Sequence, residues 1–146
     1  MVNRLRAFLL TMASMLGNKK PAQSSPQSSG QWGEAQALHH LESRGYTIIA
    51  TNYRKRYGEI DIIARDGATL VFIEVKYRRH SGYGTGLEAV DRRKQLRLCR
   101  VAAEYLQSHQ QGDSNARFDV IAVAPAADGA GAVIDHIENA FDFLLE

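Results

Sequence analysis

The sequence predicts an α/β domain in which helices flank one mixed β-sheet, with elements in the order α-β-β-β-α-β-β. Three observations predict this class. Two short apolar strands meet across Asp66-Gly67, a strong hairpin signal. Helical patterns precede and follow the hairpin, at residues 31–44 and 85–109. An apolar run at 118–124, FDVIAVA, suits a strand that is buried on both faces.

The length of 146 residues is that of one domain with a real core. We divide the chain into an N-terminal extension and linker, residues 1–30, and a folded domain, residues 31–146. In the extension, Arg4 and Arg6 precede an apolar run that mimics a secretory signal. No clear small-residue cleavage site follows the run, and it is too short to span a membrane. We therefore expect a short helix or loose extension, and then a disordered linker rich in Ser, Gln and Pro.

The formal net charge of +2 hides an asymmetry along the chain. From Ala50 to Arg100 there are twelve Lys or Arg against six Asp or Glu, and after Arg100 only Arg117 is basic, against eight acids. A basic middle favours an anionic partner, and nucleic acid is the expected one. Cys99 is the only cysteine, so no intrachain disulfide can form, and we expect a cytoplasmic protein with no membrane partner.

The first helix is expected over residues 31–44, with Ser29 as its cap. Glu34 falls on the apolar stripe of this helix, and a glutamate on a buried face needs a partner. It either reaches over the sheet towards a metal ion or is held near the helix N-terminus by the helix dipole. His39 and His40 point about a third of a turn apart, which does not suit one zinc ion, and we expect both at the surface.

The next three strands are expected at residues 46–53, 58–65 and 70–77. Four charged residues interrupt the two hairpin strands: Glu59, Asp61, Glu74 and Lys76. Strand side chains alternate between the two faces of a sheet. Two hairpin loops of two residues each are possible, and both put all four charged side chains on one face, with Glu34 above it. With Gly67 and Ala68 as the loop, Asp61 lies directly opposite Glu74. With Asp66 and Gly67 as the loop, the two carboxylates are diagonal.

Neighbouring carboxylates repel each other unless a cation lies among them. Hard oxygen ligands at this spacing suit magnesium or manganese. Lys76, two residues after Glu74, can hold or activate a water, or neutralise charge that develops on a phosphate. A solvated strand face with one Glu–Lys pair is the alternative, and it is weaker because the charges interrupt hydrophobic strands and converge across a hairpin.

Asp61, twelve intervening residues and then Glu74-Val75-Lys76 resemble the core motif of the PD-(D/E)XK nuclease superfamily, with a spacing similar to that of archaeal Holliday-junction resolvases. The wider pattern of W-G-E, G-E-I-D, E-V-K and a later basic helix resembles the YraN-like group of bacterial proteins, described as predicted endonucleases. The resemblance covers roughly residues 31–143. It departs from the superfamily pattern at Ile60, where a proline is common.

The resemblance implies a restriction-endonuclease-like core and a metal-dependent endonuclease that acts on structured or branched DNA. The catalytic residues implied are Glu34, Asp61, Glu74 and Lys76. Asp61 and Glu74, with Glu34, would hold Mg²⁺ or Mn²⁺. Resolvases of this superfamily act as dimers, so a homodimer is an expectation that the residues themselves do not fix.

Nine side chains are expected to contact nucleic acid. They come from the turn before the acidic strand, the glycine-rich loop after the hairpin and the second helix: Arg54, Lys55, Arg56, Arg78, Arg79, Arg93, Lys94, Gln95 and Arg97. Lys94 lies on the core-facing stripe, where it would either snorkel to solvent or, as the resemblance implies for Lys94 and Gln95, approach a phosphate.

Thr85 and Asp91 are alternative caps for the second helix, which ends near residue 109. A right-handed crossover through this helix would place the strand at 118–124 parallel to the second hairpin strand. Asp119 in that strand is expected to support the site or the fold. A last strand is expected at 132–137.

Three function classes remain: a metal-dependent nuclease, a DNA-binding module that keeps the fold without useful catalysis, and a protein-interaction module that uses the basic helix. Carboxylates are unhelpful beside a phosphate, so their presence argues against the second class. The pattern is compatible with branched, nicked, single-stranded or duplex DNA and with RNA. No base-reading motif suggests sequence-specific restriction.

Overall fold

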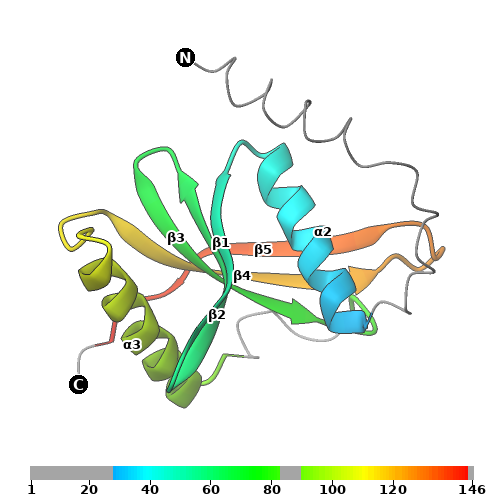
Figure 1. The fold of residues 1–146 in the computed structure, drawn as a ribbon. Helices are drawn as coiled ribbons and strands as arrows, with labels where there is room; N and C mark the ends of the chain where they lie inside the picture. The colour runs from blue at the N-terminus through cyan, green and yellow to red at the C-terminus, as the bar shows by residue number, and fades with distance from the viewer. Residues whose placement is uncertain (1–27, 83–89, 145–146) are drawn as a thin grey trace, which may run out of the picture.

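The computed structural model describes residues 28–82 and 90–144, and its elements follow the predicted order (Figure 1). The two helices are α2 (Ser29–Ser43) and α3 (Arg92–Ser108), and the five strands are β1 (Thr47–Lys55), β2 (Gly58–Asp66), β3 (Thr69–Tyr77), β4 (Ala116–Pro125) and β5 (Ala132–Phe141). The predicted extension up to residue 27 and the predicted cap Thr85 lie outside the described residues. Within those residues, neither helix has the length and apolar character needed to cross a membrane.

The strands form one mixed sheet, as predicted, and their order within it is β1-β2-β3-β4-β5. β3 and β4 are parallel, with α3 as their crossover, and the other neighbours are antiparallel. The β2–β3 hairpin pairs Asp66 with Thr69, so Gly67 and Ala68 form its loop and the first of the two predicted registers is correct. Gly67 has a φ of +58°, a conformation that glycine adopts at little cost.

The two helices cover opposite faces of the sheet. Neighbouring residues of a strand point to opposite faces, and on β3 they join different hydrophobic clusters. Phe72 packs in a cluster with Val101 of α3. Its neighbour Ile73 packs in a second cluster with Leu41 of α2. The core therefore consists of two layers, one between the sheet and each helix.

The alternation of side chains slips by one residue at Asp61. Ile60 and Ile62 would share a face in a regular strand, but Ile60 packs on the α3 side and Ile62 on the α2 side. The neighbouring strand is irregular at the same level, where Asn52 has a φ of +52°. The prediction that simple alternation places all four hairpin charges on one face is therefore wrong, because the rule breaks at Asp61.

Several element ends differ from the prediction. The cap of α2 is Ser28 rather than Ser29, because Ser28 and Gln31 bond each other's backbone N–H with their side chains at 3.2 and 3.1 Å. α3 is capped by Asp91, the later of the two predicted caps. β5 continues to Phe141, past the predicted end at residue 137.

Candidate functional site

The carboxylate of Asp61 lies in a fork where β2 and β3 separate. Paired residues of the two strands run from the loop to Ile62 and Ile73. Just beyond them, Oδ2 of Asp61 accepts a hydrogen bond from the backbone N–H of Val75 at 2.8 Å. A side chain thus takes the place of a backbone carbonyl, which holds the carboxylate between the strands and close to the sheet.

Glu74 is the buried charge of the site, with 6% of its surface exposed. It points to the α3 side, where the ammonium group of Lys94 bonds its Oε1. The ammonium group of Lys76 lies 3.4 Å from the same oxygen. Two cations therefore share one carboxylate oxygen, which offsets the cost of burying that charge.

The first turn of α3 delivers Lys94 to this position. Asp91 accepts a hydrogen bond from the backbone N–H of Lys94 at 2.8 Å, which fixes where the turn begins. Gln95, the other candidate on this turn, donates its amide to the carbonyl of Val90 at 3.0 Å. Lys94 therefore reaches the carboxylates, whereas Gln95 supports the start of the helix.

Glu34 approaches Asp61 from α2, on the opposite face of the sheet. In the orientation that satisfies its hydrogen bonds, the amide of Asn52 donates to Glu34 at 3.0 Å and to Glu59 at 2.9 Å. Asparagine tolerates the left-handed backbone that this bridge requires. The prediction that Glu34 lies over the same face as the E-x-K residues is wrong, because α2 and α3 cover opposite faces.

Two open clefts meet at Asp61. The cleft on the α3 side has a volume of about 320 Å³, and its lining includes Glu74, Lys94 and Arg97. The cleft on the α2 side has a volume of about 210 Å³, and its lining includes Glu34 and Asn52. Asp61 lines both clefts, so a ligand can reach its carboxylate from either side of the fork.

The surroundings of Asp61 disfavour its charged form. Burial and then the negative charge of Glu74 raise the pKa of Asp61 to about 7, with a smaller increase from Glu34. The N–H of Val75 acts in the opposite direction. Because burial and the neighbouring carboxylates both disfavour the anion, a cation bound at Asp61 would stabilise the charged form of its carboxylate.

The two lysines of the site differ in their protonation. Burial and the nearby Lys94 lower the pKa of Lys76, and the attraction of Glu74 only partly opposes them. Burial is the largest single effect on Lys94 and acts to lower its pKa, but the bond to Glu74, the contact with Lys76 and the charges of Glu74 and Asp61 together outweigh burial and raise that pKa. Lys94 is therefore the firmly charged partner of Glu74, and Lys76 is the lysine that loses its proton more easily.

The oxygen donors fit a hard divalent cation in part. Asp61 and Glu74 offer carboxylates from adjacent strands, which are the ligands that Mg²⁺ and Mn²⁺ prefer. Among residues 28–82 and 90–144, however, no three His, Cys, Asp or Glu side chains are already gathered into a metal-binding group. Glu74 faces two lysines and Glu34 faces Asn52, so the predicted ligands would have to exchange these partners for the ion.

The predicted phosphate contacts are distributed unevenly around the fork. Arg97 lines the α3-side cleft, and Arg93 is exposed on the same helix. Arg56 in the β1–β2 turn and Arg79 after β3 are also exposed. Lys94 and Arg97, which line the α3-side cleft, make that side of the site the more basic one.

Arg54 and Lys55 lie in β1 rather than in the predicted turn, because the strand continues to Lys55. Arg54 pairs with Glu59 at 2.9 Å, and Lys55 pairs with Glu104 of α3 at 3.1 Å. A phosphate would have to compete with these carboxylates, so both residues are weaker candidates than Arg97.

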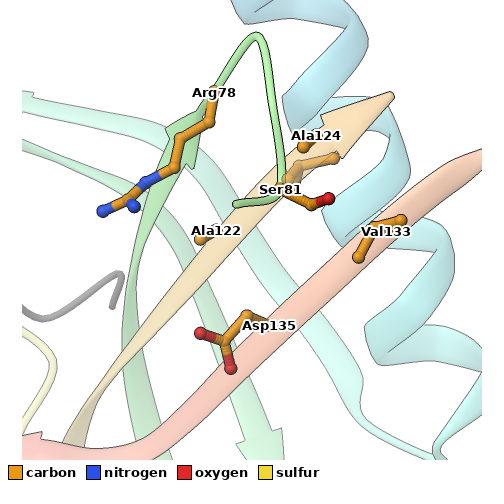
Figure 2. A pocket seen from close by; sticks show the side chains of 7 residues that line it. Arg78, Ser81, Ala122, Ala124, Val133 and Asp135 are labelled. Carbon is orange, nitrogen blue, oxygen red and sulfur yellow. The ribbon is translucent and has the colours of Figure 1, made fainter. Parts of the chain in front are cut away.

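Arg78 lines a separate small cavity beside β4 and β5 (Figure 2). The cavity has a volume of about 40 Å³, and Ser81, Val133 and Asp135 also line it. Such a volume admits a few waters but not a nucleotide. None of the charged residues of the fork lines it, so it is not part of the candidate site.

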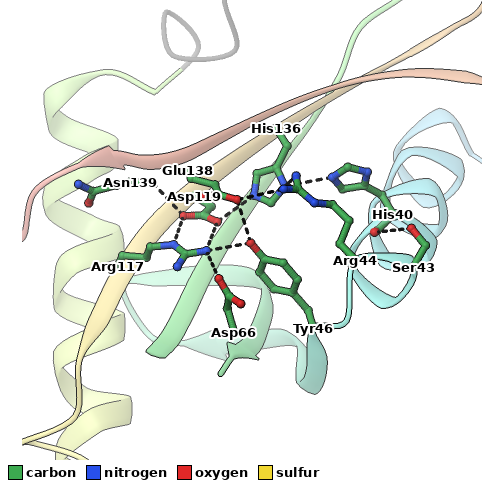
Figure 3. Close-up of polar contacts among 10 residues, drawn as sticks. All are labelled: His40, Ser43, Arg44, Tyr46, Asp66, Arg117, Asp119, His136, Glu138 and Asn139. Carbon is green, nitrogen blue, oxygen red and sulfur yellow. Dashed lines mark hydrogen bonds and ion pairs between the residues drawn. The ribbon is translucent and has the colours of Figure 1, made fainter. Parts of the chain in front are cut away.

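A second charged cluster, centred on Asp119, ties α2 to β4 and β5 (Figure 3). Asp119 is fully buried and accepts hydrogen bonds from Arg117 at 3.0 Å, from His136 at 2.8 Å and from the N–H of Asn139 at 3.0 Å. Burial alone would raise the pKa of Asp119, but the bonds from His136 and Arg117 lower it. These contacts fit the fold-supporting role that was predicted for Asp119.

His40 also belongs to this cluster, which sequence analysis missed. Its Nε2 lies 3.0 Å from Nδ1 of His136, and the residue is half-buried. The predicted surface position is therefore wrong for His40, although His39 is exposed as predicted. The helical pattern gave no sign that side chains at the end of α2 reach His136 and Glu138 of β5.

Known proteins resemble this chain over most of its length. The family model described as "Uncharacterised protein family UPF0102" matches residues 33–123, which include all the charged residues of the fork. A UPF0102 protein of Syntrophus aciditrophicus (strain SB) is 47% identical over 114 residues, covering 78% of this chain and 88% of that protein. One of Stutzerimonas stutzeri (strain A1501) is 43% identical over 120 residues, covering 82% and 98%. One of Alkaliphilus oremlandii (strain OhILAs) is 47% identical over 114 residues, covering 77% and 96%.

Proposed function

The chain belongs to the uncharacterised protein family UPF0102, and we propose that it is a metal-dependent nuclease of the PD-(D/E)XK type. Its expected substrate is structured or branched DNA, and its reaction is phosphodiester hydrolysis. One observation carries the proposal. Asp61 is held in the fork beside Glu74 and Lys76 of the next strand, with a pKa raised to about 7 by burial and by neighbouring carboxylates.

The element order and the single mixed sheet also support a restriction-endonuclease-like core. In that arrangement the carboxylates lie at a fork in the sheet, with a helix on each side of it. The α3 side supplies positive charge from Lys94 and Arg97. The α2 side supplies Glu34.

Each residue of the fork has a chemical role in this proposal. Asp61 and Glu74 would hold the ion, with Glu34 as a further ligand. When bound, Mg²⁺ or Mn²⁺ supplies Lewis acidity that lowers the pKa of a water and neutralises the phosphate. Lys76 would position the attacking water and offset charge that develops on the phosphorus centre. Lys94 would hold a phosphate oxygen by a charge-assisted hydrogen bond.

Cleavage of a panel of labelled substrates tests this proposal. The panel contains a four-way junction, nicked, single-stranded and duplex DNA, and RNA, each with Mg²⁺, with Mn²⁺ and with chelator. We expect wild-type cleavage that requires the metal and is lost in Asp61→Asn and in Lys76→Ala. Asp113→Asn is the matched control, because Asp113 is an exposed carboxylate outside both clefts.

Binding of nucleic acid in the absence of metal shows whether Asp61 acts as a metal ligand or as a direct contact to the nucleic acid. Asp61→Asn removes a negative charge that would face a phosphate, so its binding in chelator should equal or exceed that of wild type. Reversing Arg93 and Arg97 to Glu should weaken binding to every nucleic acid and flatten its salt dependence. If folded Asp61→Asn loses as much metal-free binding as the arginine reversal, Asp61 is a contact residue and the nuclease proposal fails.

The ion pair between Lys94 and Glu74 favours a second candidate, a nucleic-acid-binding module with the same fold and no catalysis. In that case a lysine, rather than a metal, permanently neutralises the buried carboxylate. Calorimetric titration with Mg²⁺ distinguishes the two. The module would show salt-sensitive binding of nucleic acid and no Mg²⁺ binding that depends on Asp61.

A further inference from the structure

We propose that a cleft between Trp32 and Tyr77 binds an unpaired nucleobase next to the fork. The inference rests on the proposed function and adds a substrate class to it. That class is a nucleic acid with at least one unpaired nucleotide beside the phosphate that the site attacks.

The cleft lies between the start of α2, the end of β3 and the β4–β5 turn. Its volume is about 440 Å³, which is within the range of small-ligand sites. Trp32 and Gln36 line it from α2, Tyr77 from β3, and Pro125 and Gly129 from around the turn. The lining thus combines two aromatic rings with one side-chain amide.

The two rings form a corner that suits a flat, aromatic ligand. Trp32 and Tyr77 meet edge to face, with centroids 6.0 Å apart and planes at 88°. Both are half-buried. Trp32 also packs against the α2-side cluster, which accounts for one part of its surface but not for the part that lines the cleft. Aromatic side chains that line an open groove stack nucleobases without regard to sequence.

Tyr77 connects this cleft to the fork. It also lines the α2-side cleft that contains Glu34 and Asp61. Val75, which bonds Asp61, precedes Tyr77 by two residues, or roughly 7 Å along an extended strand. That distance is comparable to the step between successive phosphates of an extended nucleic-acid strand. A phosphate at Asp61 would therefore leave a neighbouring nucleotide within reach of Tyr77.

The packing of α2 fixes the relative positions of the two clefts. At Gly33 the helix lies against Tyr77, where an added Cβ would be 3.5 Å from the Cβ of Tyr77. Trp32 and Glu34 flank this contact, so one faces the aromatic cleft and the other faces the fork. Gln36, one turn further, offers an amide that can bond the edge of a base.

Trp32 is the only tryptophan of the chain, so its fluorescence reports directly on the cleft. The full chain is titrated in chelator with an oligothymidylate and with a strand of equal length that consists of abasic sugar phosphates. Binding of each labelled strand is followed in parallel by anisotropy. We expect the oligothymidylate to quench Trp32 and the abasic strand to bind without quenching it. Saturating oligothymidylate that leaves the emission unchanged would overturn the inference.

Trp32→Leu and Tyr77→Leu keep an apolar side chain and remove the ring. Each should weaken binding of the oligothymidylate at least about fivefold and leave binding of the abasic strand unchanged. Tyr57→Leu is the matched control, because Tyr57 is 40% exposed in the β1–β2 turn and lies outside the cleft. An equal loss with the abasic strand would contradict base stacking. If Trp32→Leu does not fold, the wild-type quenching and Tyr77→Leu decide the matter.

Cleavage assays distinguish failure of this inference from failure of the proposed function. If the protein cleaves fully paired duplex in a metal-dependent way but cleaves neither single strands nor junctions, the nuclease proposal stands and the base-binding cleft is refuted. If oligothymidylate quenches Trp32 but no substrate is cleaved in a metal-dependent way, the cleft stands as a base-binding site and the nuclease proposal is refuted.

Discussion

Asp61→Asn should stabilise the metal-free protein at neutral and alkaline pH and leave its stability nearly unchanged in acid. Burial and Glu74 raise the pKa of Asp61 from 3.8 to about 7 in the folded state. The folded protein therefore binds more protons than the unfolded chain between these two values, so wild-type stability falls as the pH rises through that window. Asparagine does not titrate, and its carbonyl oxygen can still accept the N–H of Val75.

The magnitude follows from the size of the pKa shift. A shift of about three units in the pKa of Asp61 corresponds to about 4 kcal/mol above pH 7, and this figure is an upper limit because the fork can relax around the charged carboxylate. We expect a gain of about 1–4 kcal/mol for Asp61→Asn at pH 8, which shrinks towards zero near pH 4. For a chain of this length each kcal/mol raises the melting temperature by roughly 2–4 °C.

Thermal unfolding followed by circular dichroism, from pH 4 to pH 8.5 in chelator, measures this difference. Asp113→Asn is the control for removal of an exposed carboxylate. Adding Mg²⁺ at pH 8 should raise the melting temperature of wild type and not that of Asp61→Asn, because only an ion that binds the folded state stabilises it. A difference in melting temperature between Asp61→Asn and wild type that stays constant from pH 4 to pH 8.5 would refute the argument.

Two further substitutions test the framework around the site. Gly58→Ala should cost about 1–2 kcal/mol in urea unfolding, because its Cβ would come 3.1 Å from Val101 of α3, whereas Gly112→Ala meets open space and should not show this cost. Asp119→Asn should cost about 1–3 kcal/mol in the same assay, because it removes the buried anion that Arg117 and His136 bond, although Arg117 keeps its ion pair with Asp66 at 3.0 Å. An Asp119→Asn protein as stable as wild type would show that the cluster contributes no net stability.

Local patterns were sufficient to predict the order of the elements and the position of the hairpin, but they left two registers open, and the pairing of Asp66 with Thr69 selects one of them. Asp66-Gly67 has few alternatives to a turn, and the apolar run at 118–124 suits a strand buried on both faces. The same regularity led to the error at Asp61. Strict alternation was assumed, whereas the strand slips at Asp61, at the level of Asn52 in β1, whose φ is +52°.

The partners of the charged residues were harder to predict, because they come from distant segments. Asn52 is an unusual residue inside a strand pattern, and that oddity was the only signal for its bridge between Glu34 and Glu59. His40 and His136 are 96 residues apart in the sequence, and their contact depends on where the tertiary fold places the end of α2 relative to β5. Propensity and periodicity describe one element at a time, so they cannot place such pairs.

The parallel pairing of β3 with β4 has a consequence for how the chain folds. The β2–β3 hairpin closes over two residues and can form early, but the neighbour of β3 arrives only after α3 has crossed the sheet. Until then the apolar edge of β3 is open to pairing with other chains. Glu74 and Lys76 interrupt that edge, so we infer that they also act as gatekeepers against aggregation. Replacing both by threonine should therefore increase light scattering during refolding, and an unchanged signal would contradict this role.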